Sequence, residues 1–548
     1  MAGLAPNNRS RHPSIEIVKL SLVKCAENEP STERPSSRRL RADTFEPLDD
    51  QSPPSQCSRR QSRRLSLQGI LQAPPATHTG ASTQPDRDSN PLDPIRITES
   101  SPSETESQST RSRRLVRAQR LQNVWLHWAT AYRLIVAFTL AVNASVLVYV
   151  ASRHRNSSNI LIATSINLLV AVLVRQEDLI NIAFHFVAKI PCTWPLPLRK
   201  AIADLHHYGG LHVGCTVSAL FWYILFVVDG TINVVHHRNT STMTSWLWGS
   251  LFTAYTFMVC LIAVCITAHP HLRTRCHNTF EHTHRFGGWF ALLVLWINSG
   301  VASRSPDTPT SIYRTAPIYL LLLTTALIIL PWLRIRRIPI TATPISTREI
   351  KLTFPSANHP STSTVKISRR PLSDWHAFAT IPSPTSATAT ILISKAGDWT
   401  SNLITSPPTR LWLRNPPAQN FLALAPLFSS LLLVATGAGI GPVLSLLTSP
   451  AIRLMRTQRK LVKVMWTAYA PDAEHWAFVQ ERIRKVDAEP LVFDSRVARP
   501  DVAFEVGEVV RAWGVEAVMV VSNPRVTEEV VSRIKGQGGA AYGAVFDS

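Results

Sequence analysis

The sequence predicts a multi-domain membrane protein in which an α-helical transmembrane bundle precedes a small β-barrel and an α/β domain. Apolar blocks of bilayer-spanning length appear from Tyr132 onwards. Short β-type runs follow after Thr341, and strand and helix patterns alternate after Ser430. We therefore expect four segments, which are a disordered tail (1–120), the helical domain (121–338), the barrel (339–428) and the α/β domain (429–548).

Length and composition exclude several classes of protein. A chain of 548 residues is too long for a single hydrophobic core. The net charge of +21 would suit nucleic acid, but Arg residues flank apolar blocks and favour a membrane surface instead. We expect no nucleic-acid partner. The seven cysteines include no C-x-x-C pair, so neither a disulfide scaffold nor a metal site is predicted.

The first 120 residues are rich in Ser, Pro, Arg and Gln and poor in aromatic residues. Such a segment cannot bury enough apolar surface to offset the entropy of ordering, which predicts disorder. The first 30 residues lack the apolar stretch of a signal peptide.

Six apolar blocks predict six membrane spans and a lipid bilayer as partner. They lie at 131–151, 159–174, 211–229, 246–268, 287–303 and 315–333. Basic residues are more numerous in the tail, in the 175–206 and 269–286 loops and after the last block. By the positive-inside rule these parts are cytosolic. We expect an integral protein of the plasma membrane with both termini in the cytosol.

The region from Thr341 to Pro426 contains short β-type runs, which predict a small β-barrel or a sandwich. The clearest runs are Glu349–Phe354, Ala377–Ile381 and Thr390–Ile393. Beyond Ser430 the predicted strands are 431–435, 462–467, 491–493, 516–521 and 541–546. The predicted helices are 442–457, 473–486, 501–513 and 525–535. This alternation indicates a parallel sheet with helices on its faces.

The most informative stretch is a glycine-rich turn between an apolar strand and an apolar helix. It comprises Thr436, Gly437, Gly439, Gly441 and Pro442. Glycine permits positive φ and close approach of a ligand, and N–H groups at a helix start bind phosphate. We predict that these residues hold a nucleotide diphosphate. The alternative is a glycine-rich turn that binds no ligand.

Several motifs together resemble the ferredoxin–NADP reductase superfamily, in the arrangement of ferric reductases and NADPH oxidases. They are most similar to the fungal TmpA-like integral membrane flavoprotein family, which is linked to conidiation signalling. The motifs are 174–181, His207–His212, His284–Trp289, Asp374–Ile381, Lys395–Thr400 and Ala541–Ser548. The resemblance implies a six-helix membrane domain, an FAD-binding β-barrel and a nucleotide-binding α/β domain. It implies FAD and NAD(P)H as cofactors.

The resemblance also implies a flavin site. The segment from His376 to Ile381 is similar to a His-Pro-Phe-Thr/Ser motif, with Phe378 against the isoalloxazine and either Thr380 or the backbone near it hydrogen-bonded to that ring. A second motif would supply Lys395 to the FAD pyrophosphate, together with Trp399 and Thr400. Phe546 is a candidate for the aromatic residue that covers the flavin. The alternative is that these are ordinary barrel strands with core aromatic residues.

On the nicotinamide side the resemblance assigns Arg499 to a phosphate or ribose, and a solvated loop arginine is the alternative. Ser522-Asn523-Pro524 stands where relatives have Cys-Gly-Pro, so Ser522 is predicted to contact the nicotinamide. Asn523 adds bulk near the ring, which disfavours fast hydride transfer. Ser522 and Phe546 are thus the predicted catalytic residues.

Haem is not expected. Histidines cluster near the cytosolic ends of the predicted spans, and 247–267 contains none, so the paired histidines of a two-haem relay are missing. One cofactor between His212 and His284 stays open, beside the alternative of interfacial histidines that hydrogen-bond to helix ends.

Three functional hypotheses follow. The first is an FAD- and NAD(P)H-dependent oxidoreductase that passes electrons from nicotinamide to FAD and on to a small, unknown acceptor. The second is a regulatory or signalling membrane flavoprotein with little turnover. The third is a scaffold without cofactor, which the intact glycine-rich turn disfavours.

Overall fold

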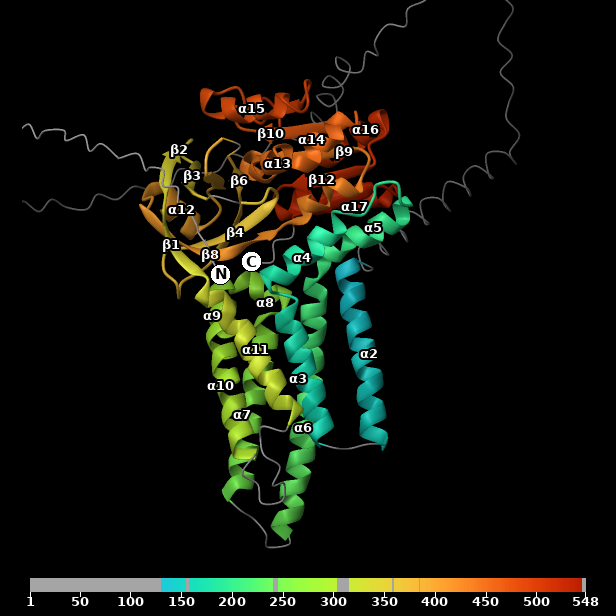
Figure 1. Ribbon diagram of the computed structural model, residues 1–548, viewed down its shortest axis with the longest axis vertical. Coiled ribbons are helices and arrows are strands. Elements are labelled where there is room, and N and C mark those ends of the chain that lie inside the picture. Colours follow the sequence, from blue (N-terminus) through green and yellow to red (C-terminus); the bar gives the residue numbers. More distant parts are fainter. Residues whose placement is uncertain are drawn as a thin grey trace, which may run out of the picture. The chain divides into compact units, whose positions relative to one another are not determined.

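The structure is a computed structural model that describes residues 130–153, 157–239, 245–302, 315–356, 359–383 and 385–544 (Figure 1). The predicted disordered tail and Phe546 lie outside the described residues. The described ranges all belong to one compact unit, 99–548.

All six predicted apolar blocks form helices, and Figure 1 shows them as long ribbons. They are α2 (Ala131–Arg153), α3 (Ser157–Leu173), α6 (Gly209–Asn239), α7 (Ser245–Thr267), α10 (Gly288–Ala302) and α11 (Ala316–Leu333). By length and composition alone, four of the helices that the structure describes could cross a membrane, namely α2, α6, α7 and α11. Two bent helix pairs pass the same test only if each is counted as one span, namely Ser157–Leu173 with Glu177–Val187, and Gly437–Leu447 with Pro450–Thr457 in the C-terminal domain. Among the described residues, α10 does not pass this test, so the span predicted at 287–303 stays a prediction.

Short helices lie between the long ones. α4 (Glu177–Val187), α5 (Leu196–Ala203) and the 3-10 turn η2 (Asp204–His207) separate α3 from α6. α8 (Pro270–Arg275), α9 (His277–His282) and the π-type turn η3 (Thr283–Gly287) separate α7 from α10. Glycine lets α6 approach α2, because a Cβ at Gly210 would lie 2.6 Å from the Tyr132 carbonyl oxygen.

Two four-stranded antiparallel sheets follow the helices. One has the order β1 (Ile335–Pro339), β8 (Arg410–Gln419), β4 (Ser363–Ser368) and β5 (His376–Ala379). The other has the order β2 (Thr341–Pro344), β3 (Glu349–Pro355), β7 (Thr388–Ser394) and β6 (Ile381–Pro382). The helix α12 (Asp398–Thr405) follows β7.

The predicted closed barrel is wrong, because no pair of described strands joins the two sheets. The chain passes from β5 to β6 through the single residue Thr380, and the ladder stops there. The sheets nevertheless share one core, to which Leu352 of β3, Ile391 of β7, Val365 of β4 and Leu411 of β8 contribute. This arrangement agrees with the sandwich alternative.

The C-terminal domain has a five-stranded parallel sheet, as predicted. Its order is β11 (Leu491–Asp494), β10 (Val462–Ala468), β9 (Leu431–Thr436), β12 (Ala517–Val521) and β13 (Ala540–Gly543). In chain order this is 3-2-1-4-5, the order of a doubly wound nucleotide-binding sheet.

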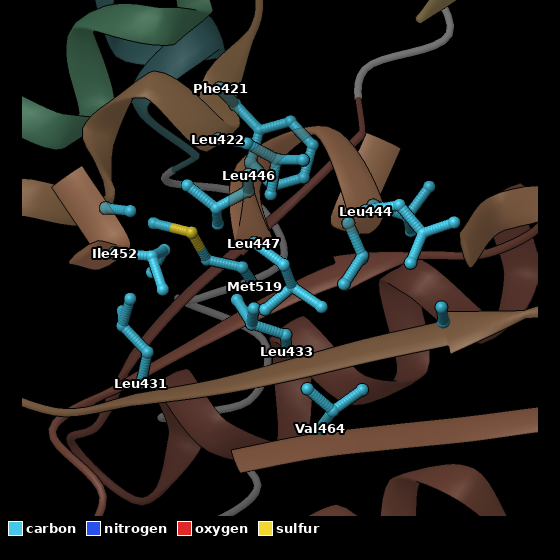
Figure 2. Close-up of a cluster of buried hydrophobic side chains, with 14 of the residues drawn as sticks. Phe421, Leu422, Leu431, Leu433, Leu444, Leu446, Leu447, Ile452, Val464 and Met519 are labelled. Atoms are coloured by element: carbon cyan, nitrogen blue, oxygen red, sulfur yellow. The ribbon is translucent and has the colours of Figure 1, made fainter. Parts of the chain in front are cut away.

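Helices cover both faces of the parallel sheet. Figure 2 shows Leu444 of α13 (Ile440–Leu447) and Ile452 of α14 (Pro450–Thr457) packed with Leu433 of β9. α15 (Ala477–Arg484) covers the same face, whereas α16 (Val502–Trp513) and α17 (Pro524–Gly536) cover the other. The single helix predicted over 442–457 is two, because Ser449 caps a new helix that begins at Pro450.

Buried charges connect the helical segment to both sheet domains. Arg199 of α5 is 5% exposed, donates to the Leu427 carbonyl and pairs with Glu516 at 2.6 Å. Burial raises the pKa of Glu516, but hydrogen bonds from Arg199 and Ser429 outweigh it and leave that pKa below its ordinary value. Glu177 of α4 pairs with Lys366 and Arg414, each at 3.0 Å.

We predict that Arg199→Ala lowers the thermal midpoint of the detergent-solubilised protein, at a cost of about 3 kcal/mol, because it leaves Glu516 without its cation. The matched control is Lys200→Ala on the same helix, whose exposed hydrogen bond contributes little. Because the pKa of Glu516 is lowered on folding, the difference between Arg199→Ala and wild type should shrink as the pH falls through that pKa. Equal midpoints for both variants would contradict the prediction.

Candidate functional site

The candidate site lies at the carboxyl ends of β9 and β12. The chain builds β9, β10 and β11 on one side and then crosses to place β12 against the free edge of β9. In open α/β sheets the crevice at such a reversal binds ligands. The hydroxyls of Thr436, at the end of β9, and Ser522, directly after β12, are 2.7 Å apart. Two residues predicted separately are thus brought together by a hydrogen bond.

The glycine-rich turn lies beside this hydrogen bond. At two of its positions the backbone conformation or the close packing requires glycine. Gly437 has φ +53°, which disfavours other residues. Its carbonyl accepts from the indole N–H of Trp466 at 3.1 Å. A Cβ at Gly439 would lie 2.5 Å from the Val521 carbonyl oxygen. The turn therefore presses against β12 and leads directly into α13, whose first N–H groups suit an anion.

Gly441 and Pro442 have a different environment. A Cβ at Gly441 would be 3.5 Å from Leu392 of β7, an ordinary contact distance. Gly441 is buried and Pro442 is half-buried at the start of α13. These two residues lie where the α/β domain meets the antiparallel sheets.

The flavin candidates form an aromatic cluster in the antiparallel sheets. The ring of Trp399 lies 4.2 Å from that of His376 and 5.9 Å from that of Phe378, and all three are half-buried. The His376 Nε2 atom is buried and has no hydrogen-bond partner among the described residues. Burial lowers the pKa of His376, despite the opposing charge of Asp374, so the imidazole is neutral near pH 7. An orphaned neutral imidazole beside two aromatic rings suits a planar, polar ring such as a flavin.

The two predicted hydroxyl contacts are engaged inside the fold. Thr380 is fully buried, and its hydroxyl lies 2.9 Å from that of Ser363. The Thr400 hydroxyl accepts from the backbone N–H groups of Ala396 and Gly397 and so caps α12. Lys395, by contrast, is exposed and directly precedes this turn.

Arg499 is exposed in the segment between β11 and α16. β11 is the outermost strand of the sheet and is separated from β9 by β10. Arg499 therefore lies beyond the carboxyl end of a parallel strand, as the site does, but not beside the β9–β12 pair. The last described residue, Ala544, donates to the Val520 carbonyl at 3.1 Å.

The sequence prediction missed a charged cluster on this edge. Arg496, after β11, binds Asp472, after β10, at 2.6 Å, and it also contacts Asp494. Asp472 lies 24 positions before Arg496, so the sequence near one strand did not reveal the cluster. The signal available was topological, because the carboxyl ends of neighbouring parallel strands meet at one edge.

The chain is similar to proteins that are named reductases. Residues 421–548 match the family model described as adenylate-forming reductase 03009, C-terminal domain. The chain is 33% identical over 427 residues to adenylate-forming reductase 03009 of Coprinopsis cinerea, covering 76% of this chain and 40% of that protein. It is also 33% identical over 389 residues to adenylate-forming reductase 06235 of the same fungus, covering 70% and 36%.

The chain thus spans about 40% or less of the length of these curated relatives. The longer match must include most of the helical segment as well as the sheets, because no other part of the chain is long enough to hold it. These comparisons do not bear on the resemblance to the fungal TmpA-like family, which stays a prediction.

Among solved structures, the chain is similar to a ferredoxin NADP+ reductase from Neisseria gonorrhoeae with bound FAD and NADP. That match has 13% identity and a TM-score of 0.31, and it covers 38% of this chain and 98% of the other. An Amycolatopsis cytochrome P450 reductase matches with 10% identity and a TM-score of 0.29, over 39% and 70% of the two chains. The fold assignment rests instead on the strand order described above.

We predict that Gly439→Ala disrupts the turn, because its new methyl group would overlap the Val521 carbonyl. Overpacking of this kind costs about 1–3 kcal/mol. Gly441→Ala is the matched control, since its methyl group meets only ordinary contacts. Thermal unfolding with and without NADH should show a lower midpoint and loss of nucleotide stabilisation in Gly439→Ala alone. Equal behaviour of the two variants would refute the role assigned to Gly439.

Proposed function

We propose that this chain is a membrane-embedded flavoprotein oxidoreductase. Electrons pass from a nicotinamide nucleotide to FAD and then to a small acceptor. The observation that carries the proposal is the Thr436–Ser522 hydrogen bond at the topological switch point, directly beside the glycine-rich turn. The names of the relatives, both reductases, support the same class of activity.

The aromatic cluster holds the flavin in this proposal. When bound, FAD accepts a hydride from the nicotinamide and releases electrons to the acceptor. Phe378 and Trp399 would pack on the ring, and the orphaned Nε2 of His376 would hydrogen-bond to its polar edge. The exposed Lys395 supplies a point charge for the pyrophosphate.

The glycine-rich turn would hold the nucleotide. Gly437 and Gly439 would bring backbone to its diphosphate, and the Ser522 hydroxyl, held by Thr436, would orient the nicotinamide. The side chain of Asn523 accepts a hydrogen bond from the Val526 N–H and caps α17, so it is held at the start of that helix. Ser522, together with Thr436, therefore supplies the hydroxyl groups at the crevice.

A lipid bilayer surrounds the long helices in this proposal. Large apolar side chains on them are exposed, with Phe138 of α2 and Phe252 of α7 each 72% accessible. Exposed apolar surface on this scale is unfavourable in water and favourable in lipid. The proposed location is the plasma membrane, with both termini in the cytosol.

A regulatory flavoprotein with little turnover is the second candidate. It is favoured by Ser522-Asn523-Pro524, which departs from the Cys-Gly-Pro of the reductases that the chain resembles. The TmpA-like resemblance also favours it. The two candidates share cofactors and differ in the rate of hydride transfer.

The charged cluster at the end of β10 and β11 favours NADH over NADPH. Acidic side chains near the end of the second strand suit a ribose hydroxyl, whereas a free arginine suits a 2′-phosphate. Arg496 is held by Asp472 and Asp494, so the three groups carry a net negative charge. That charge repels a phosphate.

The first test is the absorbance spectrum of the purified, detergent-solubilised protein. We expect a flavin spectrum without a Soret band, and NADH should bleach it anaerobically within seconds. Ser522→Ala should keep its flavin but bleach roughly tenfold to hundredfold more slowly, because the nicotinamide is less well oriented. A flavin that NADH does not bleach supports the regulatory candidate, and a colourless protein that takes up no FAD refutes both.

The second test compares the two nucleotides. Wild-type protein should be reduced faster by NADH than by NADPH at equal concentration. Asp472→Ala removes one carboxylate from Arg496 and should shift the ratio several-fold towards NADPH. The matched control is Glu481→Ala, which removes an exposed ion pair on α15. An unchanged ratio in Asp472→Ala would contradict the assignment of this cluster to the ribose.

A further inference from the structure

Three potential metal ligands lie together in the turn η2, between the helices α5 and α6. Asp204, His206 and His207 each offer one ligand atom, and these atoms all lie within 4.8 Å of one another. A search of the described residues for three or more His, Cys, Asp or Glu side chains close enough to hold a metal ion finds this group. The sequence did not suggest it, because the histidines resembled others at helix ends.

The orientation of His206 suits a metal ligand. Its Nδ1 lies 2.8 Å from the Ala203 carbonyl oxygen, which can only accept, so Nδ1 carries the proton. Nε2 then has a free lone pair in the neutral tautomer. Metal-bound histidines are commonly held in this way by a backbone carbonyl. The ring is 8% exposed and lies 3.9 Å from the ring of His207.

The cluster faces the α/β domain. Lys535 of α17 lies 3.1 Å from the carboxylate of Asp204, and the ring of Tyr542 of β13 lies 5.7 Å from His206. The Lys535 ammonium therefore competes with a metal ion for the Asp204 carboxylate. A divalent ion would displace it, and the flexible, partly exposed lysine side chain can move away.

We propose that Asp204, His206 and His207 bind a divalent transition-metal ion. Two imidazoles and one carboxylate are donors that zinc accepts, and three protein ligands leave a position for water. Donor atoms around tetrahedral zinc are about 3.4 Å apart, given bond lengths near 2.1 Å. Small side-chain rotations therefore close the site. Hard ions such as Mg²⁺ prefer oxygen ligands and bind poorly here.

The site is independent of the proposed flavin chemistry. Its ligands come from the helical segment, whereas the competing cation comes from the α/β domain. Metal binding would thus break the Asp204–Lys535 ion pair between the helical segment and the α/β domain. The Asp204 carboxylate would then bind the metal together with the two histidines of the helical segment. The alternative is a stacked histidine pair beside an ordinary ion pair, which binds no metal.

The experiment uses the full chain in detergent, stripped with a chelator and titrated with Zn²⁺, with Mg²⁺ as the comparison ion. Calorimetry and metal analysis should give one Zn²⁺ per chain that Mg²⁺ does not displace. His207→Gln and Asp204→Asn should each weaken that binding by about tenfold or more. Co²⁺ should give a visible absorption band that both variants lose.

Lys535→Met sharpens the test, because removing the competing ammonium should strengthen Zn²⁺ binding several-fold. A structural defect would not have this effect. Lys200→Met is the matched control, since Lys200 contacts the same domain through Gly538 and not through the cluster. Flavin content, measured in parallel, should be equal in all variants, which separates this proposal from the flavin assignment. Zinc binding that is absent, or that none of the variants changes, overturns the proposal.

Discussion

The pairing of β9 on both edges is the constraint on which the site depends. β9 is the first strand of its domain, yet it lies at the centre of the sheet between β10 and β12. The connections to its two neighbours therefore leave in opposite directions and cover opposite faces, which opens a crevice at the carboxyl edge. The side chains from Leu431 to Ala435 are buried, and Thr436 is the first residue of the strand to reach this crevice. The turn, Gly439 and the Ser522 contact all follow from that position.

A second set of contacts fixes the helical segment to this frame. Arg199 is buried against the start of β9 and β12, where Glu516 and the Leu427 carbonyl accept its hydrogen bonds. Glu177, on the preceding helix, pairs with cations on β4 and β8. One short connection between α3 and α6 therefore reaches both sheet domains. Buried ion pairs add little net stability but are costly to break, so they specify this arrangement more than they strengthen it.

The parts of the fold that were predictable are those that local pattern dictates. Blocks of about 20 apolar residues became helices, and the runs of β9, β10 and β12 became strands, because length and burial decide those outcomes locally. Whether the two antiparallel sheets pair with each other depends on strand pairing between distant segments, which the local sequence pattern does not determine. The helix break at Pro450 was visible in principle, since Ser449-Pro450 is a helix start. The contact of Arg496 with Asp472 depends on tertiary structure, whereas the η2 residues are close in sequence and were not distinguished from other histidines at helix ends.

The hydrogen bonds of the structure alter which residues of the candidate flavin site are available to bind a ligand. The two motifs placed Thr380 beside the flavin and Thr400 in the cofactor site, yet both hydroxyls already have partners within the protein. Breaking such bonds to bind a cofactor would cost about as much as the new bonds return. The Nε2 of His376 is different, because it is buried and lacks a partner among the described residues. A buried polar atom without a partner is unfavourable until something binds it. We infer that the imidazole, and not the threonine hydroxyls, makes the polar contact to the flavin ring.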